Sequence, residues 1–232
     1  MTPLHLIAVA IPAYQAELSV GDVVRRARQC IENVVVVDDG SSDMTAAAAE
    51  AAGARLIRHP RNLGKGRALH TAFTDLFERG TEQVLTLDAD GQHLPEDIPL
   101  LVDAARLGAD LVIGSRDHLF DEMHPVRRTS NRCSSFLISV VAGRTLSDFQ
   151  SGFRLYTKSL IDATGFPEPR FEAESAVAVR AIRSGFRVAT VPIRLGFADG
   201  RATSYYRPVI DSLRIAYAVI RARLETMGRP VG

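Results

Sequence analysis

Residues 84–93 read Val-Leu-Thr-Leu-Asp-Ala-Asp-Gly-Gln-His, an apolar run that ends in two carboxylates one residue apart. The run predicts a buried strand, and Gly91 predicts that the chain turns away after it. Asp88 and Asp90 then lie at the carboxyl end of that strand, and Gln92 adds a third oxygen. Such an oxygen-rich set suits Mg²⁺ or Mn²⁺ held together with substrate phosphates. A lone Asp-x-Asp is more often an ordinary turn, so the rest of the chain must decide.

Outward from this stretch, short apolar runs alternate with amphipathic segments. Strands are expected at residues 6–11, 34–37, 55–58, 84–87, 111–113 and 187–191. Helices are expected at residues 16–30, 43–52, 65–79, 95–107, 127–142, 172–184 and 208–226. This alternation predicts an α/β fold with a mostly parallel, doubly wound sheet, in one domain spanning residues 1–232. Ligands of such sheets bind beyond the carboxyl ends of the strands, where the polar residues of this chain gather.

Composition narrows the classes of partner. The chain has 232 residues, 46% hydrophobic and 24% charged, with a net charge of +1 and no Trp. A strong positive field and a base-stacking platform are both missing, so we expect no nucleic-acid partner. Two cysteines make no disulfide framework or metal pattern. No apolar run approaches the length of a membrane span, and Pro12 interrupts the first one. A cytoplasmic protein is therefore expected.

Two further motifs follow predicted strands in the first half. Residues 36–43, Val-Val-Asp-Asp-Gly-Ser-Ser-Asp, place Asp39 where it can accept hydrogen bonds from a nucleobase or a ribose, an interpretation we prefer to a turn residue. Asp43 fits a helix cap better. Residues 62–69, Asn-Leu-Gly-Lys-Gly-Arg-Ala-Leu, open a helix, and Lys65 could face a phosphate there. Neither the P-loop nor the dinucleotide-binding spacing is present, so this motif alone is weak.

Several charged residues in the second half of the chain could have either a binding role or a structural one. Arg154, with Arg116, Arg127 and Arg128, could contact phosphates or simply pair with surface acids. Glu172 and Glu174 could favour a helix dipole, or one of them could line an acceptor pocket. Among six scattered histidines, only His93, beside the acidic motif, is a site candidate.

Taken together, six motifs occur in one order along the chain. They are Ile-Pro-Ala-Tyr-Gln-Ala-Glu (11–17), Val-Val-Asp-Asp-Gly-Ser-Ser-Asp (36–43), Asn-Leu-Gly-Lys-Gly (62–66), Leu-Asp-Ala-Asp-Gly-Gln-His (87–93), Gly-Ser-Arg (114–116) and Gln-Ser-Gly-Phe-Arg (150–154). With them the chain resembles the family 2 glycosyltransferases of the GT-A fold, a Rossmann-like three-layer α/β/α architecture. Within that family it is most similar to the dolichyl- and polyprenyl-phosphate mannosyltransferase branch. Position 15 is Gln where the family usually has Asn, and Phe149 is unusual in its motif.

The resemblance implies a nucleotide-diphosphate sugar donor, a Mg²⁺ or Mn²⁺ ion and transfer with inversion. The nucleotide sugar would contact Pro12, Tyr14, Glu17, Asp39, Lys65, Asp88, Arg201 and Ser204, with Arg207 as a further candidate in the loop 197–208. The metal would be held by Asp88, Asp90 and Gln92. The acceptor phosphate would face Arg116, Arg128, Ser130 and Arg154.

The acceptor decides whether a base is needed. A lipid phosphate brings an anionic oxygen and needs no strong base, whereas a hydroxyl needs a carboxylate to take its proton. Asp148 and Glu172 are the candidates for that role, beside Asp90 and Arg116 at the reacting centre. The leading hypothesis is transfer of a hexose to a polyprenyl phosphate. The alternatives are transfer to a hydroxyl of a glycan, lipid or small metabolite and, ranked lower, a sugar-phosphate nucleotidyltransferase or a non-catalytic nucleotide-binding protein.

The C-terminal part of the chain is basic. From Arg194 to the end there are seven Arg against three acids, a net charge of +4. In the predicted helix 208–226 an apolar stripe is formed by Val209, Leu213, Ala216, Ile220 and Leu224, with Arg214 and Arg221 off it. A basic amphipathic helix can lie on an anionic membrane, which gives the hypothesis of peripheral membrane contact. An ordinary helix packed on the core remains the simpler interpretation.

Overall fold

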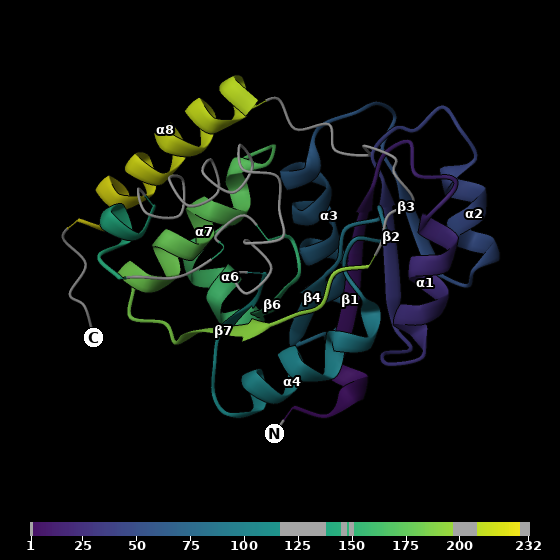
Figure 1. Ribbon diagram of the computed structural model, residues 1–232, viewed down its shortest axis with the longest axis horizontal. Helices are drawn as coiled ribbons and strands as arrows, with labels where there is room; N and C mark the ends of the chain where they lie inside the picture. The colour runs from purple at the N-terminus through teal and green to yellow at the C-terminus, as the bar shows by residue number, and fades with distance from the viewer. Residues whose placement is uncertain (1, 117–137, 145–147, 149–150, 197–207, 228–232) are drawn as a thin grey trace.

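The computed structural model describes residues 2–116, 138–144, 148, 151–196 and 208–227 (Figure 1). Its described strands form a seven-stranded sheet in the order β3-β2-β1-β4-β6-β5-β7. The strands are β1 (Ile7–Ala13), β2 (Val34–Asp38), β3 (Arg55–Arg58), β4 (Gln83–Thr86), β5 (Leu111–Ser115), β6 (Arg154–Thr157) and β7 (Val188–Pro192). All pairs are parallel except those of β6, which runs antiparallel to β4 and to β5. The predicted α/β fold with a mostly parallel sheet is confirmed.

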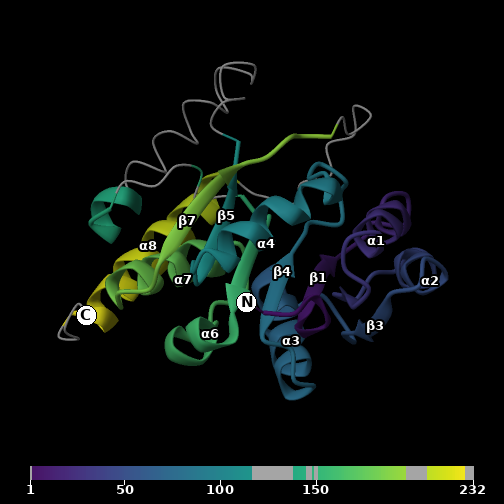
Figure 2. The same cartoon turned by 90° about the horizontal axis from the view of Figure 1, so that it is seen from below.

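Helices cover both faces of the sheet. The helices are α1 (Val20–Arg28), α2 (Thr45–Ala51), α3 (Lys65–Glu78), α4 (Ile98–Arg106), α6 (Lys158–Thr164), α7 (Glu172–Arg183) and α8 (Pro208–Thr226). Alternate residues of β1 point to opposite faces, so that Val9 joins a core with α1, α2 and α4, while Ala10 joins one with α3, α6 and α7. Figure 2 shows these two helix layers on either side of the sheet. Helix α8 packs on α7 and so lies on the outside of the second layer.

Two regions differ from the sequence expectation, and a third lies mostly outside the described residues. The helix expected from residue 16 begins at Val20, and residues 16–19 instead form part of the wall of a cleft. Strand β6 and helix α6 were not expected, because a strand of four residues that contains Arg154 shows no apolar periodicity. Most of the helix expected at 127–142 lies outside the described residues, although residues 138–142 are helical.

The described helices include none that is both long and apolar enough to cross a membrane.

Candidate active site

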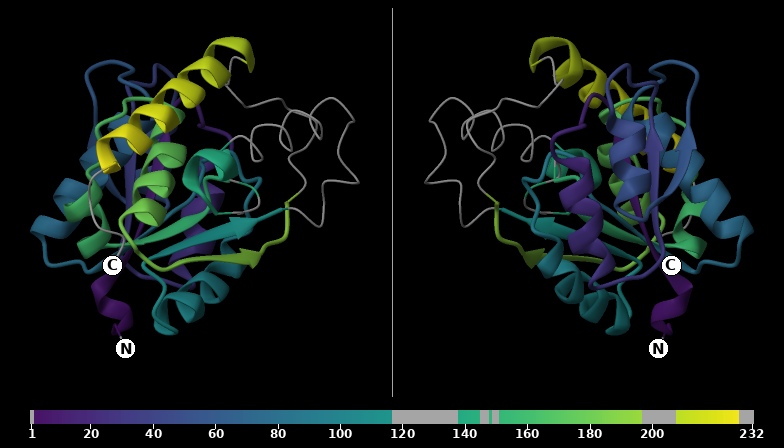
Figure 3. Two further views of the ribbon diagram at one scale, coloured as in Figure 1. Left: turned by 90° about the vertical axis from the view of Figure 1, so that its left-hand side faces the viewer. Right: turned by 90° about the vertical axis from the view of Figure 1, so that its right-hand side faces the viewer.

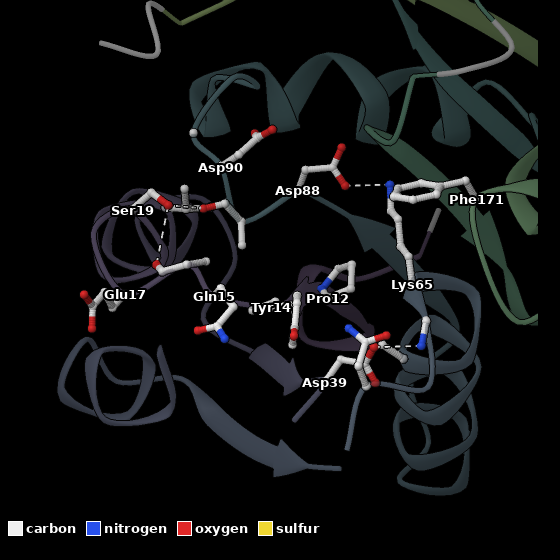
Figure 4. Close-up of a pocket in the computed structure, with 18 of the residues that line it drawn as sticks. Pro12, Tyr14, Gln15, Glu17, Ser19, Asp39, Lys65, Asp88, Asp90 and Phe171 are labelled. Atoms are coloured by element: carbon white, nitrogen blue, oxygen red, sulfur yellow. Dashed lines mark hydrogen bonds and ion pairs between the residues drawn. The ribbon is translucent and has the colours of Figure 1, made fainter. Parts of the chain in front are cut away.

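A cleft of about 1180 Å³ opens where β1, β2 and β4 end (Figure 4). That volume is ample for a ligand larger than a typical drug-sized molecule. Among the residues that line it are Pro12, Tyr14, Glu17, Asp39, Lys65, Asp88 and Asp90. Seven of the predicted site residues, from motifs far apart in the sequence, therefore share one cleft. Its position is the one that the topology of an open α/β sheet favours for ligands.

Hydrogen bonds between neighbouring loops hold the segment after β1. The Gln15 backbone N–H donates to Ser41 Oγ at 3.0 Å, and its side-chain amide donates to Ser42 Oγ at 2.8 Å. The Glu17 carboxylate accepts from the Met44 N–H at 2.9 Å. Gln15 has a φ of +52°, a left-handed conformation that is uncommon for residues other than Gly. This wall of the cleft is thus shaped by its backbone.

Asp39 is nearly fully buried and anchors the next loop. Its Oδ1 accepts from the Leu63 N–H at 2.9 Å and lies 2.7 Å from His59 Nδ1, while its Oδ2 accepts from the Gly64 N–H at 2.8 Å. Gly64, with a φ of +102°, brings the chain close to Pro169, where a Cβ would lie 2.5 Å from the carbonyl oxygen. The carboxylate expected to contact a nucleoside therefore also fixes the loop that begins α3.

Lys65, the first residue of α3, sits between two carboxylates. Its Nζ lies 2.6 Å from Asp88 Oδ1 and 3.0 Å from Glu174 Oε2, and its side chain is only 14% exposed. Burial alone would lower the pKa of Lys65, but the charges and hydrogen bonds of the two acids outweigh it and raise that pKa. Lys65 was expected to face a phosphate; here its ammonium pairs with carboxylates at the edge of the cleft.

Gly152 leaves the space that the ion pair between Lys65 and Asp88 occupies. A Cβ at Gly152 would lie 2.5 Å from Asp88 Oδ2 and 2.6 Å from Lys65 Nζ. Any side chain there would displace one of the two groups. The glycine of the Gln-Ser-Gly-Phe-Arg motif therefore leaves room for the ion pair, a role that its sequence position did not reveal.

The pKa values of Asp88 and Asp90 are shifted in opposite directions, although only one residue separates the two. Burial would raise the pKa of Asp88, but the ammonium of Lys65 holds it below its ordinary value. Burial and the negative charge of Asp88 raise the pKa of Asp90, whose Oδ1 accepts from the Gln92 N–H at 3.0 Å. Two carboxylates that repel each other at a cleft are a favourable environment for a cation.

The residues present fit a divalent cation of the hard, oxygen-preferring kind. Among the described residues no three His, Cys, Asp or Glu side chains cluster into a site made by protein alone. Mg²⁺ does not need one, because it keeps several waters and binds through one or two carboxylates plus substrate phosphates. Asp88 and Asp90 can supply those carboxylates, and Gln92, half-buried beside them, carries an amide oxygen.

His93 is buried beneath this turn. Its ring packs against Phe153 at 5.5 Å between ring centroids, and its Nδ1 lies 3.8 Å from Asp88 Oδ2. Burial lowers the pKa of His93 to about 4. It therefore stays neutral at ordinary pH, and neither of its ring nitrogens has a hydrogen-bond partner among the described residues.

Arg116 and Asp148 were expected as separate site residues, and the structure pairs them. Arg116, directly after β5, donates from Nε to Asp148 Oδ2 at 2.6 Å, from Nη2 to Oδ1 at 2.7 Å, and from its backbone N–H to Oδ2 at 3.0 Å. Asp148 is 1% exposed. Both oxygens of this buried carboxylate are therefore engaged with Arg116. The position of Asp148 thus argues against the role of proton acceptor and for holding Arg116.

Arg154 departs from its expected role. It is fully buried on β6 and donates to the carbonyl oxygens of Ser151 and Glu174 at 2.7 and 2.5 Å. This position argues against contact with an acceptor phosphate: Arg154 ties strand β6 to α7. Glu172, the first residue of α7, is also buried, and its Oε2 lacks a hydrogen-bond partner among the described residues.

Several predicted residues cannot be placed. Arg127, Arg128, Ser130, Phe149, Arg201, Ser204 and Arg207 lie outside the described residues. Conversely, Asn62, Arg170, Phe171, Asp211 and Arg214 line the cleft although the sequence analysis did not select them for it. Asn62 stands in a quoted motif, whereas Arg170 and Phe171 precede α7 without any motif that marks them.

A family model and two relatives match the chain. The model described as "Glycosyl transferase family 2" matches residues 8–165. The chain is 30% identical over 230 residues to an uncharacterised protein of Methanocaldococcus jannaschii, covering 94% of this chain and 92% of that protein. It is 32% identical over 209 residues to the polyprenol monophosphomannose synthase of Mycolicibacterium smegmatis, covering 82% and 77%. Other curated relatives, 31–32% identical, are longer, and the chain spans 59–61% of their length.

A solved structure shares the fold. The glucosyl-3-phosphoglycerate synthase of Mycobacterium tuberculosis, in complex with Mn²⁺, uridine diphosphate and phosphoglyceric acid, superposes with a TM-score of 0.72. The match covers 97% of this chain and 79% of that one, at 21% identity.

Proposed function

The chain belongs to glycosyl transferase family 2, and from this premise we propose that it transfers a hexose, with inversion, from a nucleotide-diphosphate sugar to a polyprenyl phosphate. The observation that carries the proposal is the cleft itself, in which the segment after β1, Asp39 and the Asp88–Asp90 turn face one space. A nucleoside, a diphosphate and a reacting sugar can be held there in sequence.

The donor nucleoside is assigned to the wall made by Pro12, Tyr14, Glu17 and Asp39. A carboxylate offers about four acceptor sites. Three donors, from His59, Leu63 and Gly64, occupy part of the capacity of Asp39. The remaining capacity suits a base N–H or a ribose hydroxyl.

The diphosphate is assigned to the Asp88–Asp90 turn and the start of α3. Asp88, Asp90 and Gln92 would hold Mg²⁺ or Mn²⁺, which neutralises charge on the departing nucleotide diphosphate when it is bound. Helix α3 begins at Lys65, and the N-terminus of a helix favours an anion. The M. tuberculosis structure with Mn²⁺ and uridine diphosphate supports a metal-bound donor.

The acceptor is assigned to the side of the cleft near Arg116. A lipid phosphate supplies its own anionic oxygen, so no side chain has to remove a proton. Arg116, oriented by Asp148, would hold that phosphate, with Arg128 and Ser130 proposed beside it. The name of the M. smegmatis relative, which refers to a polyprenol phosphate product, supports this choice.

A hydroxyl acceptor is the second candidate function. It needs a carboxylate base, and Glu172 is the candidate that remains, because Asp148 is engaged by Arg116. A hydroxyl acceptor predicts that transfer depends on Glu172, whereas a phosphate acceptor does not.

The test follows nucleotide release from a panel of uridine- and guanosine-diphosphate sugars with Mn²⁺, with and without polyprenyl phosphate. We expect release only when the lipid phosphate is present and expect EDTA to stop it. Release that depends on a hydroxyl acceptor, and is lost in Glu172→Gln, would favour the second candidate. No turnover with any donor and acceptor, together with no metal-dependent nucleotide binding, would end the proposal.

A further inference from the structure

Helix α8 carries a second apolar face that points away from the protein. Its inner face, including Ile215, Val219 and Ala222, joins the core beside α7. The opposite face exposes six large apolar side chains, here called the outer stripe: Ile210, Leu213, Tyr217, Ile220, Leu224 and Met227, which are 46–70% exposed. Their spacing of three and four residues places them on one side of the helix. The stripe expected from the sequence is thus largely the exposed face, while a different face packs.

An exposed stripe of this size calls for an occupant. A helix of 19 residues is about 28 Å long, and monomeric soluble proteins seldom leave so long an apolar surface in water. The views in Figure 3 show α8 along the outside of the molecule, over α7. Among the described residues nothing covers the outer stripe.

The charges beside the outer stripe indicate the chemistry of the occupant. Arg214 and Arg221 flank it on one side and Arg223 on the other, at the positions that face a partner helix in a coiled coil. In a pair of identical helices these arginines would approach one another and repel. The side chains of Arg214 and Arg221 are 47% and 59% exposed, and each pairs with an acid of the same helix, Asp211 or Glu225, so that the three arginines keep an excess of one positive charge over these two acids. The flanks therefore suit an anionic surface better than a second copy.

The outer stripe is continuous with the active-site cleft. Asp211 and Arg214, in the first turns of α8, belong to the lining of the cleft. A surface laid along the stripe consequently reaches the edge of the cleft. Tyr217, in the middle, combines an apolar ring with a hydroxyl, a combination suited to the boundary between lipid and water.

We propose that the outer stripe binds an anionic lipid bilayer, with α8 lying in the plane of the membrane and its arginines among the headgroups. The inference rests on the proposed function, because a membrane-embedded acceptor explains why the cleft adjoins such a surface. Binding would gain from the buried apolar side chains and from the attraction between arginines and anionic headgroups.

The test is co-sedimentation of the full chain with vesicles of phosphatidylcholine containing about a third phosphatidylglycerol, without donor and without polyprenyl phosphate. We expect binding that weakens as salt screens the arginines. Leu213→Ser with Ile220→Ser should lower the partition coefficient about tenfold or more. The matched control is Leu100→Ser on α4 with Leu107→Ser at its C-terminal end, which removes two leucines exposed by 46% and 79% and should leave binding unchanged.

A charge reversal separates the electrostatic part. Arg221→Glu should weaken binding to anionic vesicles, whereas Arg25→Glu on α1, at a similarly exposed arginine, should not. No binding of the wild-type chain at low salt would overturn the proposal. So would a dimer in sedimentation velocity that the Leu213→Ser, Ile220→Ser variant loses, since it assigns the stripe to a second copy. The vesicle test contains no substrate, so it is independent of the nucleotide-release test described above. Binding to vesicles combined with no turnover in that other test would support the membrane surface and reject the proposed function.

Discussion

Asp39 and Asp88 each follow a buried strand that pairs in parallel with β1, but different groups hold their carboxylates. Asp39, after β2, accepts from two backbone N–H groups and lies beside His59. Asp88, after β4, pairs with the ammonium of Lys65, which Glu174 shares. The hydrogen bonds of Asp39 fix the loop that precedes α3. The second belongs to a cluster of charges at the turn where we propose that the cation binds.

The largest expected effect lies in the cluster of charges. Asp90→Ala should lower turnover by at least about a thousandfold, because it removes a ligand of the proposed cation. Its stability should hold or rise, since burial and Asp88 already disfavour the Asp90 charge. Turnover and urea unfolding measured side by side distinguish the two effects. Asp103→Ala, at an exposed acid of α4, is the control and should change neither. Near-normal turnover in Asp90→Ala would show that the cation is held elsewhere.

Lys65→Met should have the next largest effect, this time on folding. It leaves Asp88 and the buried Glu174 without their shared cation, and breaking a buried ion pair from one side costs about 3–5 kcal/mol of the free energy of unfolding. Adding Glu174→Gln removes one of the stranded charges and should restore part of the loss. Urea titration of both variants and the wild type measures this. If the double variant is no more stable than the single one, the two carboxylates do not act as one cluster.

Asp39→Asn should have a smaller effect of another kind. The side chain of Asn has one acceptor oxygen, so it can keep only one of the two hydrogen bonds that Asp39 accepts from the Leu63 and Gly64 N–H groups, and about 1–3 kcal/mol of stability should be lost. Binding of the uridine or guanosine nucleotide that the chain prefers, measured by calorimetry, should weaken as well. Asp110→Asn weakens a similar bond, which the carboxylate accepts from the Arg187 N–H at the opposite edge of the sheet. It should cost stability without affecting the nucleotide, and equal losses of binding in both variants would remove Asp39 from the donor site.

The same contrast explains what could be predicted from the sequence. Asp39 and Asp88 follow continuous apolar runs, and strand ends gather at one edge of a parallel sheet, so their meeting in one cleft was predictable. The partner of Lys65 was not, because Glu174 comes from a helix with no local link to α3. Likewise Arg116 and Asp148 were both selected, yet only the folded chain pairs them. Strand β6 was not predicted because its first residue, Arg154, is charged and leaves too short an apolar run. The hydrogen bonds by which Arg154 is buried, to two backbone carbonyl oxygens, form only in the folded chain.

The smallest expected effect concerns the backbone conformation of Gln15, on the side of the cleft where Asp39 lies. Gln15 holds a φ of +52° in the wall of the donor side, where Asn is tolerated better than longer side chains. Gln15→Asn should therefore raise the free energy of unfolding by about 0.5 kcal/mol, less whatever the bond from Gln15 to Ser42 contributes. Gln29→Asn, at a residue with a φ of −70°, is the control and should bring no gain. Chemical denaturation at low and high salt measures both variants. A gain that does not change with salt places the energy of this wall in its geometry, whereas a loss in Gln15→Asn shows that the hydrogen bond to Ser42 outweighs the left-handed backbone.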